Sequence, residues 1–447
     1  MEFSENPLNI KVSTTSLLRY AFPTILSNTF MNVYSIVDQL FVSNLLGTDA
    51  LSAVSIAGPF LAVALAIGMM IATGGCALVF SQMGEAKMEK ARQNFSLFVL
   101  LSLEISTLFC IVGIVFREPI LYAMRADQTL YSLCEAYAVP IFLLIPFAML
   151  SILFQIFFVA AGRLGLGFGL SVAGGLMNIV LDYILIAAVP LGVAGAAYAT
   201  AAGYLLQALI GVGFFSANRK AESLYFVRPQ FDGKALRKAC SNGISEMVGM
   251  LAVTVTMIAM NIILMKLIGS DGVAAAAIIL AVQTILSASY AGYVQGIASV
   301  ISYHYGARQD AALGALYHIA LRTVAMLSIL TFESVFLLAR PIALLFANGS
   351  IAVVNMAVRG TFLFAAAFLL MGIKLFASGF FTALNDGKTS AILSLFRTLV
   401  FLLLPLLILP GLLGVDGVWI SMPTAELLSV LLSIFYFQKY KTQYQYA

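Results

Sequence analysis

Two aspartates stand inside long apolar stretches of the first half of the sequence, where an ionisable side chain is costly and suggests a function. Asp38 and Asp182 each lie a few residues before the end of their stretch, roughly 10 Å below the same membrane surface at a rise of 1.5 Å per residue. Tyr34 precedes Asp38 by four residues, which puts the two side chains on one helix face. Asn178 stands in the same relation to Asp182. Thr200 enters the next apolar stretch from the same surface, so we expect all five side chains in one layer.

This layer is suited to binding a monovalent cation. Two close carboxylates in a low dielectric cannot both stay ionised, so one of them would hold a proton. Carboxylate, amide and hydroxyl oxygens also suit Na⁺, whose ligands would be Asp38, Asn178, Asp182 and Thr200. The alternative is that hydroxyls or backbone groups cap the acids and that the cluster only packs helices together. The residue types favour a binding site for H⁺ or Na⁺, and none of them indicates a cofactor.

A second polar cluster is expected in the other half of the chain, near the opposite membrane surface. Glu246, Lys374 and Arg397 lie at similar depths there, and an internal network of these charges would let the membrane tolerate them. The network would either serve gating or substrate binding, or only pair charges structurally. Lys374 could instead extend to the membrane surface. Three further acids stand isolated and are expected to face a cavity or the interface: Glu104, Glu333 and Glu426.

The composition limits the class of protein. Of the 447 residues, 62% are apolar and 10% are charged, whereas soluble domains are about 45–50% apolar and about 25% charged. A soluble enzyme, a nucleic-acid binder and a disordered protein are therefore excluded. Long unbroken apolar runs favour a helical membrane protein over a barrel, because a barrel has short alternating segments.

Polar and Pro/Gly breaks divide the apolar runs into twelve spans, each reaching the roughly 20 residues that cross about 30 Å of hydrocarbon. The predicted spans are 16–44, 52–80, 93–116, 131–157, 163–189, 191–216, 240–266, 274–303, 314–338, 355–381, 388–410 and 414–438. Lys and Arg gather strongly in the segments on the side of the N-terminus. This asymmetry predicts a multi-pass protein of the cell (plasma or inner) membrane with both termini in the cytoplasm.

The two halves of the chain resemble each other. LLGTDALSA at 45–53 is similar to LIGSDGVAA at 267–275, an offset of 222 residues. We therefore predict an N-lobe at 1–216 and a C-lobe at 240–447, joined by a cytoplasmic linker at 217–239. Six spans in each half relate the lobes by a pseudo-twofold axis along the membrane normal. This parallel repeat is typical of secondary transporters.

At the level of motifs, the chain resembles the MATE family of multidrug and toxic-compound extrusion transporters over essentially its full length. SNGISEM and ISYHYGA are similar more narrowly to its MepA-like branch. The motifs are VDQLFVSNLLGTDALSAVSIAGP at 37–59, AAGR and NIVLD within 160–182, PLGVAGAAYAT at 190–200, SNGISEM at 241–247 and ISYHYGA at 301–307.

The resemblance implies two six-helix lobes that form a V and open alternately to each face of the membrane. It implies export of bulky, often cationic and lipophilic compounds in exchange for H⁺ or Na⁺. Cation binding to the aspartates would bend the first helix near Pro23. Some branches place acids on helices 7 and 10; here Glu246 lies on helix 7, but Lys374 takes the place of an acid on helix 10. In prokaryotic members the N-lobe cation site matches the five residues chosen above: Tyr34, Asp38, Asn178, Asp182 and Thr200.

We therefore expect a secondary active antiporter that works as a monomer. Its partners would be the lipid bilayer and small-molecule drugs, with no nucleic acid and no cofactor besides the coupling ion. The alternative is a flippase for lipid-linked oligosaccharides or polysaccharides of the same superfamily. A flippase should line its cavity with many basic residues, and the central spans offer only Lys374 and Arg397. An enzyme or a channel is not expected, because neither a catalytic constellation nor a continuous polar pore is visible.

Overall fold

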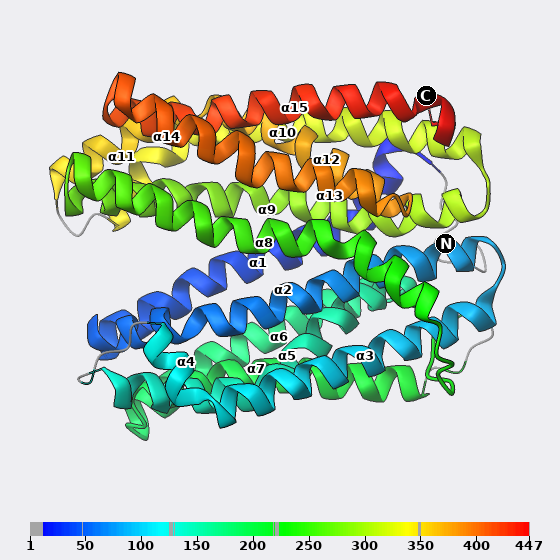
Figure 1. The fold of residues 1–447 in the computed structure, drawn as a ribbon, viewed down its shortest axis with the longest axis horizontal. Coiled ribbons are helices and arrows are strands. Elements are labelled where there is room, and N and C mark those ends of the chain that lie inside the picture. The colour runs from blue at the N-terminus through cyan, green and yellow to red at the C-terminus, as the bar shows by residue number, and fades with distance from the viewer. Residues whose placement is uncertain are drawn as a thin grey trace. The chain divides into compact units, whose positions relative to one another are not determined.

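The computed structural model describes residues 12–46, 48–124, 128, 130–217, 219, 223–346 and 350–446. Every regular element in these ranges is a helix, including two short π-helical segments, η1 and η2 (Figure 1). The elements are α1 (Thr14–Leu46), α2 (Thr48–Gly84), α3 (Met88–Val115), α4 (Arg117–Ala123), α5 (Tyr131–Ala160), α6 (Leu164–Asp182), η1 (Tyr183–Ala188), α7 (Val193–Ala217), α8 (Gly233–Leu267), α9 (Ser270–Gly306), α10 (Asp310–Phe346), α11 (Ile351–Phe364), α12 (Ala366–Ala383), α13 (Gly387–Leu395), η2 (Phe396–Val400), α14 (Phe401–Leu413) and α15 (Val415–Tyr444).

The prediction of an all-α, polytopic membrane protein is confirmed. Within the described residues, eleven helical stretches are long and apolar enough to cross a membrane. The first predicted span corresponds to α1, which lies outside that set. Three predicted spans are not single α-helices: 163–189 runs from α6 into η1, 355–381 is divided into α11 and α12, and 388–410 contains α13, η2 and α14.

The internal repeat recurs in the backbone as well as in the sequence. Ala86 and Arg308, which lie 222 residues apart, both adopt a positive φ, of 59° and 53°. At each of them a helix ends with the same two backbone hydrogen bonds, the arrangement that commonly closes a helix in a left-handed residue. The same recurrence relates Gly162 to Asn385 and Gly192 to Gly414. Equivalent turns at equivalent places support two copies of one folding pattern.

The chain divides into two compact units, and the change of unit falls inside helices. Unit 1 contains Phe30–Gly243. Unit 2 contains the described residues up to Thr29 and those from Ile244 onward. Both α1 and α8 therefore continue from one unit into the other. The predicted lobe limits of 1–216, 217–239 and 240–447 stay a prediction.

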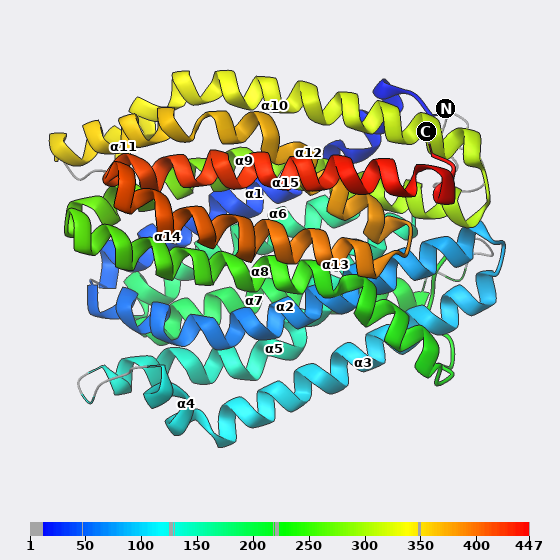
Figure 2. The same cartoon turned by 45° about the horizontal axis from the view of Figure 1, so that its top comes forward.

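Each unit is a layered helix bundle. In unit 1, α5 packs against α2, α3 and α7, and α6 packs against α7; these helices run side by side in both views (Figures 1 and 2). In unit 2, α12 packs against α9, α10 and α15, and α14 packs against α15. The core of unit 2 is rich in aromatic rings at the end where α15 finishes, where Tyr446 is 1% exposed and donates to Phe437 O at 2.7 Å.

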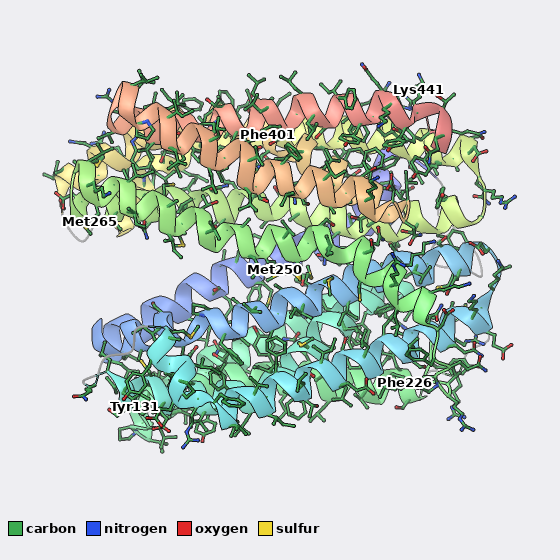
Figure 3. The ribbon with its side chains drawn as sticks, viewed as in Figure 1. Tyr131, Phe226, Met250, Met265, Phe401 and Lys441 are labelled. Atoms are coloured by element: carbon green, nitrogen blue, oxygen red, sulfur yellow. The ribbon has the colours of Figure 1, made fainter. Side chains whose placement is uncertain are left out.

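The second part of the predicted linker packs against unit 1. The Phe226 ring stacks on Phe95 with centroids 5.4 Å apart and lies among the side chains near the start of α3 (Figure 3). The backbone N–H groups of Phe226 and Val227 donate to Phe215 O at 3.1 Å and to Ser96 Oγ at 3.0 Å. The guanidinium of Arg92 lies 4.2 Å from the Tyr225 ring centroid. Residues 225–227 are thus attached to α3 and α7.

Candidate cation-binding site

Close contact between α6 and α7 brings the two halves of the candidate site together. A Cβ on Gly203 of α7 would lie 2.8 Å from the carbonyl oxygen of Gly174 on α6, so only glycine allows the backbones to approach this far. A Cβ on Gly175 would lie 2.6 Å from the Phe30 ring, and Phe30 stacks near Tyr34 with centroids 6.3 Å apart. Small residues on α6 therefore let α7 and the second part of α1 converge.

Asn178 joins Thr200 to Asp182. Asn178 and Asp182 are 1% and 0% exposed. The amide is assigned the orientation in which its nitrogen donates to Asp182 Oδ2 at 3.3 Å. Its oxygen then accepts from the N–H and the hydroxyl of Thr200, at 3.0 and 3.2 Å. The predicted i, i+4 pairing on α6 and the predicted depth of Thr200 are both reproduced by these contacts.

Asp38 completes the cluster from α1. Its carboxyl group hydrogen-bonds with Asp182 and with Asn178. A carboxylate has no donor, so a hydrogen bond between two carboxyl groups requires a proton on one of them. Asp182 ends α6 and directly precedes the π-helical segment η1, and such segments are frequent at functional sites.

Two carboxyl oxygens in the cluster lack a partner. Asp38 Oδ1 and Asp182 Oδ1 are buried, and neither has a hydrogen-bond partner in the described part of the chain. A buried, unpaired acceptor is costly, and the cost is larger for a charged group. These oxygens, with the amide and the hydroxyl beside them, fit a proton or a monovalent cation that prefers oxygen ligands. Among the described residues, no group of three or more His, Cys, Asp or Glu could hold a metal ion.

Three tyrosines surround the carboxyl pair. Tyr34 interacts electrostatically with both aspartates, as predicted from its position before Asp38. Tyr137 on α5 also interacts with both, and Tyr204 on α7 interacts with Asp38. The sequence reasoning missed these two. Tyr204 follows Thr200 by four residues and could have been found by the same helical spacing, whereas nothing in the sequence placed Tyr137 on α5 beside α1.

A separate charged cluster lies within unit 2. Lys374 on α12 forms an ion pair with Glu426 on α15, and their side chains are only 14% and 2% exposed. Arg397 is 7% exposed and donates from Nη1 to Lys374 O at 3.4 Å. It lies in η2, so both π-helical segments adjoin ionisable residues. Glu246 is half-buried and interacts electrostatically with Arg397.

The expectation that Glu426 is isolated was wrong. It is the acid that pairs with Lys374, because α12 and α15 are neighbours in the bundle although the two residues lie 52 positions apart. The pairing also excludes the alternative in which Lys374 extends to the membrane surface. Glu104 and Glu333, the other two isolated acids, are exposed.

A family model now decides the class of protein. The MatE model matches residues 23–184 and 247–407, one segment in each half of the chain. The chain belongs to the MatE family. The family is one of transporters, so this protein is a multi-pass membrane transporter and not an enzyme.

Relatives and solved structures agree with this assignment. The chain is 23% identical to the multidrug export protein MepA of Staphylococcus saprophyticus over 93% of this chain and 91% of that protein. It is 24% identical to MepA of Staphylococcus haemolyticus over 94% and 92%. The fold is similar to that of MATE in complex with MaL6, with a TM-score of 0.93 at 20% identity. An outward-facing MATE family transporter of the MOP superfamily gives 0.91 at 21%, and both structures are covered over 100% of each chain.

Proposed function

We propose that this MatE transporter exports bulky, often cationic and lipophilic compounds in exchange for H⁺ or Na⁺. It works by alternating access, and the coupling cation binds at the N-lobe cluster of Tyr34, Asp38, Asn178, Asp182 and Thr200. The multidrug export proteins to which the chain is similar support the substrate class. The carboxyl pair supports the antiport.

One observation carries the coupling proposal. Asp38 and Asp182 hydrogen-bond to each other inside a membrane-spanning unit, and each keeps one buried oxygen without a partner among the described residues. A pair of this kind changes charge when it gains or loses a proton, and the low dielectric makes that change energetically large. Na⁺ would act at the same place through the oxygens of Asp38, Asn178, Asp182 and Thr200.

Exchange follows from unfavourable coupling between the cation and the drug. A cation bound from outside neutralises the carboxyl pair and favours the state that releases the drug. Loss of the cation to the inside restores the state that binds it. By linkage, each ligand weakens the affinity for the other by the same factor. Pro23 interrupts the hydrogen-bond ladder of α1, and we propose that α1 bends there when the pair becomes neutral.

The charged cluster of unit 2 is proposed to serve gating or substrate positioning through Glu246, Lys374 and Arg397. Its two bases contact Glu426 and Glu246 or lie near them. They are therefore not a free basic lining for pyrophosphate, which argues against the flippase alternative. We further propose a monomer in the cell membrane with both termini in the cytoplasm and the 217–239 linker on the same side.

The test is transport into lipid vesicles driven by one gradient at a time. Purified protein is reconstituted, and uptake of a fluorescent lipophilic cation is measured under a pH gradient or a Na⁺ gradient. One gradient should drive uptake, and Asp38→Asn and Asp182→Asn should each lower the initial rate at least tenfold. Glu104→Gln is the matched control, because Glu104 is an exposed acid within α3 and outside the cluster.

Two results would overturn the proposal. The first is uptake that neither gradient drives. The second is unchanged gradient-driven uptake in both aspartate variants, which would show that the carboxyl pair only packs helices together. Equal losses in Glu104→Gln would show that any removed acid impairs the protein, and would equally contradict a specific role.

A further inference from the structure

A corner of unit 1 carries basic and apolar side chains at a membrane boundary. The short turn between α2 and α3 and the start of α8 lie at the same end of the unit (Figures 1 and 2). Together they line a cavity of 260 Å³ and an adjoining open one of 1060 Å³. Because both elements are the ends of membrane-crossing helices, the corner lies where phospholipid headgroups begin.

We propose that this corner binds the headgroup of an anionic phospholipid. Lys234 and Lys238 supply the phosphate contacts, and Phe231 lies against the acyl chains. The proposal concerns a lipid site and stands independently of which cation or drug is transported.

Charge on the cavity lining favours an anion. Four lysines and three carboxylates line the two cavities. Lys87 pairs with Glu85 at 2.6 Å, and Lys90 lies 3.8 Å from Asp232. In the part of the chain that the structure describes, Lys234 and Lys238 form no ion pair within 4.0 Å. They are exposed and lie one helical turn apart on α8, so both ammonium groups can reach one phosphate.

The helix start itself does not bind the anion. Asp232 Oδ1 accepts from the backbone N–H groups of Lys234 and Ala235, at 3.1 and 3.0 Å. The first N–H donors of α8 are therefore already satisfied. The lysine side chains are the groups that remain available, which makes the prediction specific to them.

Phe231 identifies the ligand as a lipid. Its side chain is 84% exposed, the highest value among the large hydrophobic side chains of the described residues. It directly precedes the start of α8 and lines the larger cavity beside Lys234. An aromatic side chain at a helix end, with lysines next to it, is typical of the membrane interface, where the ring meets acyl chains and the charges meet phosphates. A soluble anion would leave the ring in water.

The experiment measures lipid binding to the full-length protein in phosphatidylcholine vesicles that contain spin-labelled phosphatidylglycerol. The protein should immobilise labelled phosphatidylglycerol in preference to labelled phosphatidylcholine. Each lysine near the surface contributes about fivefold to affinity, so the Lys234→Gln/Lys238→Gln double variant should bind roughly 25-fold more weakly. The control is Lys439→Gln/Lys441→Gln, which removes two exposed lysines of α15 and should bind as the unchanged protein does.

The remaining arms separate the sources of the phosphate. Phe231→Ser should weaken binding of the lipid, whereas inorganic phosphate at millimolar concentration should not displace it. Displacement by inorganic phosphate, with no loss in Phe231→Ser, would replace the lipid with a soluble anion and overturn the proposal. Equal binding of the two lipids, or unchanged binding in the Lys234→Gln/Lys238→Gln variant, would also overturn it. The substituted residues are all exposed, so the variants should retain the fold, which unfolding in the same detergent verifies.

Discussion

Substitution of Lys374 by methionine should destabilise unit 2 strongly. The variant keeps most of the apolar stem of the side chain but removes the cation from the Lys374–Glu426 ion pair. Glu426 is 2% exposed, and its Oε2 has no partner among the described residues. Removing one partner of a buried pair costs about 3–5 kcal/mol, because the other charge stays buried. Arg397 interacts electrostatically with Glu426 and offsets part of the loss, so we expect about 3 kcal/mol.

The double variant separates the pair from the loss of packing. Lys374→Met/Glu426→Leu removes both charges, and the replacement of a buried pair by apolar side chains is often neutral or stabilising. We therefore expect it to be more stable than Lys374→Met, with a coupling energy of about 1–3 kcal/mol between the two positions. The assay is reversible unfolding of the purified protein in mixed micelles, for the four proteins of the cycle.

Two outcomes would refute the reasoning. If Lys374→Met costs less than about 1 kcal/mol, the pair behaves as a solvated surface contact and is not buried as described. If the double variant loses the sum of the two single losses, the two side chains do not interact. A control is Arg359→Met, which breaks an ion pair with Asp416 whose side chains are 71% and 33% exposed. It should change stability by about 0–1 kcal/mol.

Two other predictions concern packing in unit 1. Phe226→Ala should lower the free energy of unfolding by about 2 kcal/mol, less than for a fully buried ring, and should expose 217–239 to protease; Phe231→Ala, at 84% exposed, should do neither. Gly203→Val should separate α6 from α7, because a Cβ there would lie 2.8 Å from Gly174 O, at a cost of about 1–3 kcal/mol. Gly203→Val should also reduce gradient-driven transport in vesicles, whereas Gly213→Val on the same helix, where a Cβ would meet nothing within 4 Å, should not; equal effects of the two would contradict the argument.

Most of the fold could be predicted because its determinants are local. A run of about 20 apolar residues must satisfy its own backbone groups in lipid, and a helix is the way to do so. The repeat was visible because both halves keep the same turn residues, and the left-handed turns at Ala86 and Arg308 follow the same offset. The breaks at η1, η2 and between α11 and α12 were not predicted. They interrupt stretches that remain apolar throughout, so composition carries no signal of them.

The candidate site was partly accessible for the same reason. Depth and a spacing of four residues are properties of single helices, and they were enough to group Asp38 with Asp182 and to find their neighbours on α1 and α6. The order in which helices pack is not a property of any single helix. It decided that Tyr137 approaches the carboxyl pair from α5, and that residues 225–227 attach to α3 and α7.

The sequence by itself determined that this protein lies in a membrane, that it is built from two related halves, and which face of each helix carries the polar residues. Only the tertiary structure decided which charges meet. Lys374 was expected near Glu246, yet it pairs with Glu426 across 52 residues of chain, and Glu246 lies near Arg397 instead. The reason is physical: helical periodicity fixes the depth and direction of a side chain, whereas its partner depends on which helices become neighbours.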